Sequence, residues 1–170
     1  MSGPPFWGKY RGTVSDNKDP LMLGRVRAEV PDVLGDTPSG WAMPCAPFGG
    51  AQTGFFAVPA KGAGVWIEFE HGDPDYPVWV GCWWGSMKDV PPKLLAPPPP
   101  WKKVMVRTEG GHQVLLDDTP GIGGITLETA EGAKIVMNAL GIEISNGKGA
   151  SLSMKGPQIS LNNGALDVMF

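Results

Sequence analysis

The chain has 170 residues, a formal net charge of −3 and a pI near 5.3, so bulk electrostatics give no reason to expect nucleic-acid binding. Its 25 glycines and 18 prolines favour turns and short strands over helices. No apolar run reaches the ~18 residues that span a bilayer, and the N-terminus lacks a signal-peptide pattern, so we expect folding in a cytoplasm.

The first part of the chain, residues 1–86, is predicted to form a small β-barrel. Five short strands are expected at residues 9–15, 23–31, 41–46, 64–70 and 78–84, with a glycine-rich loop over 47–63. Alternation predicts an inward set that comprises Val26, Ala28, Val30, Val65, Ile67 and Phe69. Five strands in so short a segment fit an oligonucleotide/oligosaccharide-binding (OB) barrel, or else an SH3-like barrel.

The two cysteines, Cys45 and Cys82, lie in different predicted strands and in no metal-type CxxC motif. Two cysteines do not make a disulfide framework. We therefore expect buried, free thiols.

Residues 87–103 form a proline-rich connector. The run Pro97–Pro100 favours extended polyproline geometry, which predicts a semi-rigid spacer between two domains. A role for this run as an SH3 ligand is the weaker alternative.

The last part, residues 104–170, consists of apolar pairs spaced two residues apart. The pairs are Ile125/Leu127, Ile135/Met137, Ile142/Ile144, Leu152/Met154, Ile159/Leu161 and Leu166/Val168. A period of two is typical of strands with one buried face. Glycines recur between the pairs, so the segment reads as short strands joined by tight turns, in a stacked β architecture.

Such a segment cannot build a core alone, because each strand contributes only about two inward side chains. The simplest solution is for several copies to share one axis. We therefore predict an intertwined oligomeric β-helix or β-prism of seven strands, counted from residue 113, in which each chain supplies one strand to each layer. An ordinary β-meander or half-sandwich with glycine turns is the alternative.

Three stretches resemble the OB domain of phage baseplate spike proteins. They are DNKDPLMLGRVRAEVPDV, WAMPCAPFGG and VPAKGAGVWIEFEHGDPDYPVWVGCWW, and GGHQVLLDDTPG resembles the next part of the same family. The family includes cell-puncturing phage spikes, baseplate assembly protein V and the valine-glycine repeat spikes of type VI secretion. The resemblance implies a homotrimer with a collar of OB domains above a β-helical spike.

The connector has no room for a lysozyme domain and the chain stops at Phe170, so we expect a minimal form without enzymatic or effector domains.

Polar residues that could carry chemistry have simpler explanations. Glu68 and Glu70 share one strand face without a partner nucleophile, which favours solvated barrel surface over acid–base catalysis. Asp73 and Asp117, with their neighbours Asp75 and Asp118, lie in turn sequences, where aspartate commonly binds its own backbone. The two histidines, His71 and His112, are far apart in sequence, and the chain lacks the HxH motif by which some phage spikes bind an axial iron. We expect no catalytic residues, no metal site and no cofactor.

Two surfaces are predicted to bind partners. The chain ends on apolar residues, and three copies of Val168, Met169 and Phe170 would form an apolar plateau on the axis. By resemblance, its partner would be a conical PAAR-type tip protein; the alternative is that these residues close the core of the prism. Arg25 and Arg27, with the loop over 47–61, are candidate contacts to a trimeric baseplate hub.

We therefore interpret the chain as the structural central spike of a contractile injection machine, in a virion tail or a phage-tail-like particle. It would touch the target membrane only transiently on puncture. A carbohydrate-binding or cell-wall-degrading tail component is the first alternative. An OB nucleic-acid-binding module is the second, to which the seven tryptophans point and the net negative charge does not.

Overall fold

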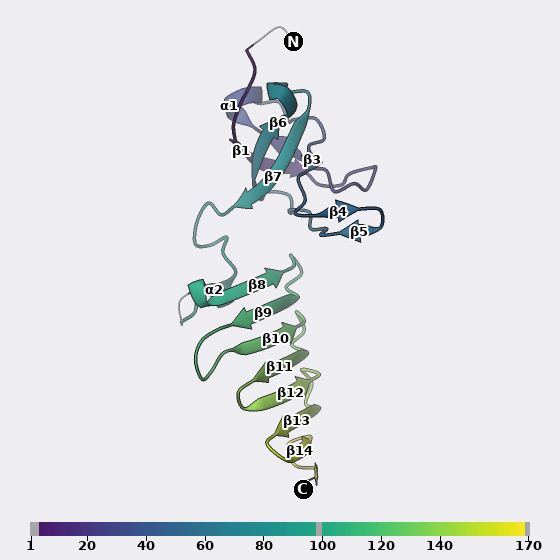
Figure 1. Ribbon diagram of the computed structural model, residues 1–170, viewed down its shortest axis with the longest axis vertical. Helices are drawn as coiled ribbons and strands as arrows, with labels where there is room; N and C mark the ends of the chain where they lie inside the picture. Colours follow the sequence, from purple (N-terminus) through teal and green to yellow (C-terminus); the bar gives the residue numbers. More distant parts are fainter. Residues whose placement is uncertain (1–3, 98–99, 169–170) are drawn as a thin grey trace. The chain divides into compact units, whose positions relative to one another are not determined.

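The computed structural model describes residues 4–97 and 100–168, and the chain divides into two compact units. Unit 1 comprises Met1–Asp89 and unit 2 comprises Val90–Phe170. Both units are built mainly from strands (Figure 1).

Unit 1 is a five-stranded barrel with the strand order β2-β1-β6-β7-β3. The strands are β1 (Tyr10–Asp16), β2 (Arg27–Glu29), β3 (Met43–Pro44), β6 (Gly64–Phe69) and β7 (Pro77–Trp83). All neighbours are antiparallel except β3 and β7, which run parallel. A bridge between Val26 and Ala42 joins the ends of β2 and β3 and closes the barrel. This is OB topology, as predicted.

The barrel core follows the predicted alternation. All six predicted inward residues are at most 5% exposed, and Val14 and Ala42 join them. Trp79, Tyr10 and Phe6 pack against this core from the side. The OB assignment is therefore supported by packing as well as by strand order.

Two predicted strands are shorter than expected. In the segment 23–31 the ladder begins only at Arg27, because the N–H groups of Leu23 and Arg25 donate to the Asp19 carboxylate instead of a neighbouring strand. The third strand is reduced to Met43–Pro44, since proline has no N–H to extend the ladder. A four-residue helix, α1 (Pro31–Leu34), follows β2 with proline in its first turn, a favourable position.

The two cysteines are free, but the prediction that they are buried is wrong. Cys45 directly follows β3 and Cys82 is the penultimate residue of β7, and both are exposed. Cys45 lies just past the two-residue β3, and Cys82 lies in β7 beyond the register shift in its pairing with β6. Nearby, within the predicted loop, a small hairpin forms from β4 (Gly49–Gly50) and β5 (Thr53–Gly54).

Unit 2 is an eight-stranded antiparallel sheet in which each strand pairs with its neighbours in sequence (Figure 1). The strands are β8 (Lys103–Arg107), β9 (Gln113–Asp117), β10 (Gly124–Glu128), β11 (Lys134–Asn138), β12 (Gly141–Ser145), β13 (Ser151–Lys155), β14 (Gln158–Leu161) and β15 (Leu166–Val168). The sequence predicted seven strands, starting at residue 113, and β8 is the additional strand. Every strand from β9 to β14 uses both backbone edges within the chain, so copies of this sheet must meet through side chains.

The connector is more structured than a polyproline spacer. It contains a helical turn, α2 (Pro92–Leu95), and a 3-10 turn, η2 (Pro100–Lys102), which leads directly into β8. The Lys103 ammonium donates to the carbonyl oxygens of Lys93 and Ala96, at 3.1 and 2.9 Å. These bonds hold the segment against unit 2.

Candidate functional site

The register of unit 2 places its apolar pairs in two continuous columns on one face of the sheet. One column consists of Val106, Val114, Leu127, Ile135, Ile144, Leu152, Leu161 and Leu166. The other consists of Val104, Leu116, Ile125, Met137, Ile142, Met154, Ile159 and Val168. We call these two columns the apolar face.

The apolar face is open to solvent in the single chain. Leu127 is 40% exposed, Val104 64% and Leu166 57%, whereas Thr126, on the opposite face of β10, is more covered than either of its apolar neighbours. This arrangement inverts the usual burial pattern, and an uncovered apolar surface of this length marks an interface.

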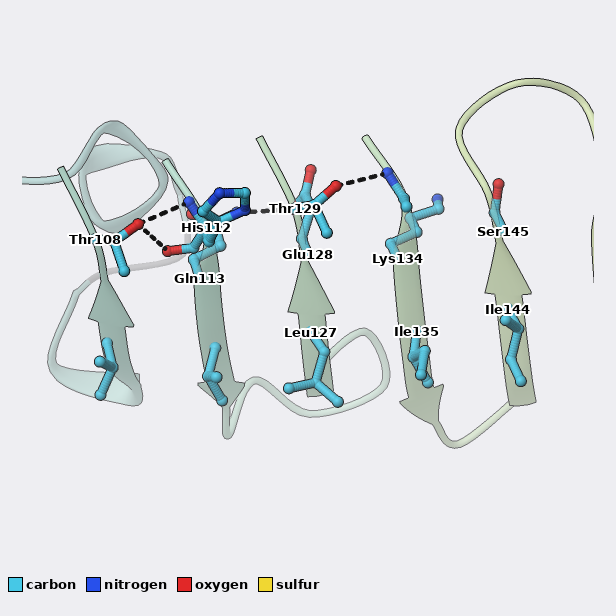
Figure 2. A pocket seen from close by; sticks show the side chains of 13 residues that line it. Thr108, His112, Gln113, Leu127, Glu128, Thr129, Lys134, Ile135, Ile144 and Ser145 are labelled. Carbon is cyan, nitrogen blue, oxygen red and sulfur yellow. Dashed lines mark hydrogen bonds between the residues drawn. The ribbon is translucent and has the colours of Figure 1, made fainter. Parts of the chain in front are cut away.

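Part of this face is hollowed, as Figure 2 shows for strands β8 to β12. The hollow has a volume of about 500 Å³, and its apolar walls are Val106, Val114, Leu127, Ile135 and Ile144. In Figure 2, Leu127, Ile135 and Ile144 project to the same side of their strands. Such a surface can receive apolar side chains of another copy of the chain, and the charged residues that line it, Glu128 and Lys134, lie at the end of β10 and the start of β11.

A polar network links α2 to the first strands of the sheet. The Glu128 carboxylate forms an ion pair with Lys93 and accepts a hydrogen bond from Gln113 Nε2 at 2.7 Å. Arg107 in turn donates to Gln113 Oε1 at 2.9 Å. The Lys93 ammonium, followed by the Gln113 amide, lowers the pKa of Glu128. The network therefore fastens the connector to β9 and β10.

The predicted turn roles of two aspartates are confirmed. Asp73 Oδ1 accepts from the backbone N–H of Asp75 at 3.1 Å. Asp117 Oδ1 accepts from the N–H of Thr119 at 2.9 Å and from its hydroxyl, and this hydroxyl is the main cause of the lowered pKa of Asp117. Glu68 pairs with Lys9 on the barrel surface.

His71 lines a small pocket with Glu70, Asp73 and Tyr76, whereas His112 directly precedes β9. His112 Nδ1 accepts from the N–H of Ala130 at 3.3 Å, in the loop that follows β10. Across residues 4–97 and 100–168, no three side chains of His, Cys, Asp or Glu come together as metal ligands would.

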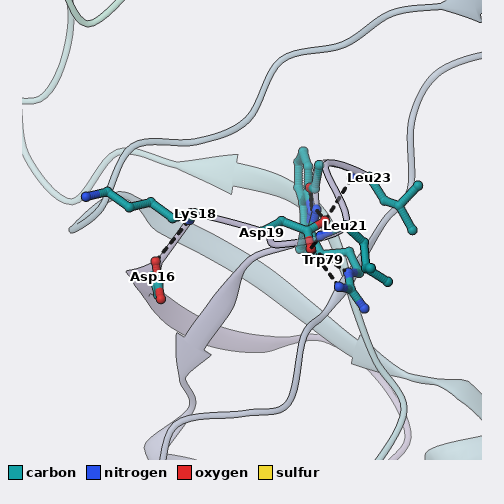
Figure 3. A network of polar contacts seen from close by, with 8 residues as sticks. Asp16, Lys18, Asp19, Leu21, Leu23 and Trp79 are labelled. Atoms are coloured by element: carbon teal, nitrogen blue, oxygen red, sulfur yellow. Dashed lines mark hydrogen bonds and ion pairs between the residues drawn. The ribbon is translucent and has the colours of Figure 1, made fainter.

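Sequence reasoning missed the role of Asp19, which organises the loop before β2 (Figure 3). Its carboxylate accepts from the N–H groups of Leu21, Leu23 and Arg25, at 3.0, 2.8 and 3.2 Å. The Arg25 guanidinium also donates to Asp19, through Nη2 at 2.6 Å, and this bond is the main reason that the pKa of Asp19 lies well below its ordinary value. The Asp19 side chain is 4% exposed. The only signal in the sequence was an aspartate before proline in a predicted turn.

The two arginines proposed to bind the hub differ in their surroundings. The Arg25 head is held by Asp19, and its side chain is 15% exposed. Arg27 is exposed and donates through Nε to the Ser39 carbonyl at 3.1 Å. Both guanidinium groups lie over the ring of Trp41, at 5.6 and 5.8 Å from its centroid. Arg25 therefore stabilises the loop next to this surface, and the exposed Arg27 side chain is accessible to a partner protein.

Of the three residues predicted to bind a tip protein, Val168 is the last residue of β15. It pairs with Ile159 and is 41% exposed, at the end of one column of the apolar face. Met169 and Phe170 lie outside the described residues.

An OB barrel followed by a sheet with one uncovered apolar face defines a class of oligomeric, all-β structural proteins. Comparison with known families agrees: residues 10–84 match the model of the type VI secretion system/phage-baseplate injector OB domain, and residues 103–167 match the phage baseplate V C-terminal trimerisation domain. The chain therefore belongs to the phage baseplate V family, whose members are structural spike proteins of baseplates and type VI secretion systems. No curated protein matches it.

Family membership indicates what covers the apolar face in the assembled protein. The matched trimerisation domain spans nearly all of the apolar face, so the chain forms a homotrimer, and we infer that this face is its shared core. The protein is a tail or baseplate component. Helices long and apolar enough to cross a membrane are absent from the described part of the chain.

Proposed function

We propose that the trimer is the central spike that transmits the force of tail contraction and pierces the target envelope. The apolar face carries this proposal, because it runs without a charged residue through all eight strands of unit 2. Three such faces packed together make a dry core, and close-packed apolar interiors deform little under load. A spike needs this stiffness along its axis.

Piercing can be tested with particles that carry altered spikes. Leu161→Ser places hydroxyls in the core near the distal end, whereas Ser160→Ala changes the opposite face of the same strand. With equal amounts of spike in the particles, we expect Leu161→Ser to release several-fold less dye from target-envelope vesicles after contraction. Equal dye release from the two particles would contradict a mechanical role for the core.

We further propose that the barrel attaches to a trimeric hub through the surface around Arg27. This residue is exposed and stacks on Trp41, while Arg25 fixes the neighbouring loop through Asp19. Arg27→Glu should abolish co-elution with the hub protein. Arg11→Glu changes an exposed arginine that stacks on Trp66 and Trp83 instead, and should leave co-elution intact. Loss of binding in both variants, or in neither, would rule out this surface.

The C-terminal end of the apolar face is proposed to carry a separate tip protein, through Val168, Met169 and Phe170. Support comes from Val168, which is apolar, partly exposed and located in the last strand. Removal of residues 168–170 should abolish binding of a PAAR-type tip protein and leave the trimer intact by light scattering. Persistent binding would disprove the proposal, and a dissociated trimer would show instead that these residues close the core.

A further inference from the structure

Unit 1 carries a second exposed apolar surface that trimerisation of unit 2 does not use. It centres on residues 47–58, which contain the β4–β5 hairpin and which we call the arm. The arm exposes Phe48, Phe55 and Phe56, at 63%, 50% and 73%. These values are high for three phenylalanines on a single hairpin, and such a patch marks a contact.

A groove of about 640 Å³ lies beneath the arm. Twenty residues line it and none of them is charged; they come from the arm itself, from Leu23 and Gly24, from residues 44–46 at the end of β3, and from residues 79–82 of β7. Both exposed cysteines, Cys45 and Cys82, are among them. The occupant of this groove must therefore be apolar and uncharged, because a charged group there would lose its hydration without gaining a partner.

The walls of the groove are fixed by hydrogen bonds and close packing. Trp79 Nε1 donates to the Gly24 carbonyl at 3.1 Å, and the Cys45 N–H donates to the Trp79 carbonyl at 2.9 Å. The ring of Phe56 covers Gly24, where a Cβ would lie 3.0 Å from the ring carbon Cε2. The groove is thus a built feature of the barrel and not a gap left by a loose loop.

We propose that the occupant is the arm of a second copy of this chain within the trimer. The arm has the required chemistry, since residues 47–58 read PFGGAQTGFFAV and contain no charge. Binding of one copy's arm in the next copy's groove is a head-to-tail contact, and three such contacts close into a ring. The proposal rests on trimerisation alone and not on hub attachment or piercing.

Tethering makes this contact favourable even if it is weak. Cys82 precedes Val90, the first residue of unit 2, by only eight positions. Three barrels are therefore joined to one trimeric stem by short connectors, and such linkage gives effective concentrations in the millimolar range, about what a weak apolar contact needs.

The native cysteines report directly on whether the groove is covered. We expect a maleimide to label Cys45 and Cys82 in the full-length trimer at least about tenfold more slowly than in Leu127→Lys, which is designed to separate the chains and leaves the groove of each barrel unaltered. Tyr76→Ser, which alters an exposed aromatic residue outside the groove, should label as slowly as the unaltered chain. Partial burial raises the pKa of the Cys82 thiol, so rates are compared for the same thiol at one pH.

A matched control keeps the chains together. Thr126→Lys, on the opposite face of the same strand, should remain trimeric and label as slowly as the unaltered chain. Equal rates in the unaltered trimer and in Leu127→Lys would overturn the proposal, because the groove would then be open in the trimer and reserved for another partner. Hub binding and piercing would be untouched by that result.

Discussion

At the scale of single residues, Asp19 shows how one carboxylate can hold an exposed apolar loop in place. Leu21, Met22 and Leu23 are 61%, 84% and 49% exposed, so packing does not fix them. Their backbone is fixed instead by the N–H groups that point at Asp19, and Met22 is held at a φ of 54°. The loop borders both the Arg27 surface and the groove of unit 1.

Replacement of Asp19 by asparagine should therefore lower the melting temperature of the barrel at pH 7. Because the folded state lowers the pKa of this carboxyl, its contribution is complete above the ordinary aspartate value of about 3.9 and fades as the pH falls through the lower, folded-state value. The difference between Asp19→Asn and the unaltered chain should shrink in acid. Thermal unfolding from pH 7 to pH 2 measures it. Asp36→Asn, an exposed charge change, should have little effect, and a pH-independent difference for Asp19→Asn would contradict the role of the charge.

Gly141 is a residue at which only glycine fits. Its φ is 138°, and a Cβ there would lie 1.9 Å from the carbonyl oxygen of Met154 in the next strand. Gly141→Ala should separate β12 from β13 and cost more than about 2 kcal/mol per chain. Gly149→Ala is the control, since Gly149 also has a positive φ but an open surrounding. Denaturant unfolding of the trimer measures both, and equal losses would show that backbone strain alone determines the cost.

At the scale of elements, each strand of unit 2 has two faces with different tasks. Leu127→Lys places an unpaired charge in the shared core of all three chains, which is costly enough to prevent association. Thr126→Lys makes the same change on the opposite face of the same strand. Light scattering should give 18.0 kDa for Leu127→Lys and 54 kDa, three chains of 18.0 kDa, for Thr126→Lys. A stable 54 kDa species for Leu127→Lys would mean that the apolar face is not the core.

The α2 turn depends on the Glu128 network. Glu128→Gln removes the ion pair with Lys93, so we expect trypsin to cleave after Lys93 several-fold faster, since a released turn is a better substrate. At the neutral pH of the assay the ion pair is intact in the unaltered chain, because the Lys93 ammonium lowers the pKa of Glu128. Glu131→Gln, in the following loop, should leave the cleavage rate unchanged. Unchanged cleavage in Glu128→Gln would show that other contacts hold α2.

Alternation and apolar pairing predicted most of these elements, because both are properties of local sequence. The inward set Val26, Ala28 and Val30 and the pairs from Ile125 to Val168 were found this way. Strand β8 was missed because Lys103–Arg107 directly follows the proline-rich connector, and this short segment was not separated from it. The groove, the Asp19 cage and the Glu128 network depend on contacts between residues that local patterns do not bring together.

At the scale of the whole molecule, the apolar face predicts that three chains are held together by apolar side chains and not by charge. Screening by salt weakens exposed ion pairs but not apolar burial. The 54 kDa species, three chains of 18.0 kDa, should therefore persist from low salt to about 1 M NaCl. Light scattering across that range measures it, and dissociation at high salt would indicate a polar interface instead.

Pairing only between sequence neighbours also has a consequence for how such proteins vary in length. One hairpin can be inserted or deleted in unit 2 without changing the partner of any distant strand, because no strand crosses over another. Each hairpin adds about 9.6 Å, two steps of about 4.8 Å, and returns the chain to the same side of the sheet. The length of the sheet is thus adjustable in fixed increments, and relatives with longer or shorter sheets should differ by whole hairpins.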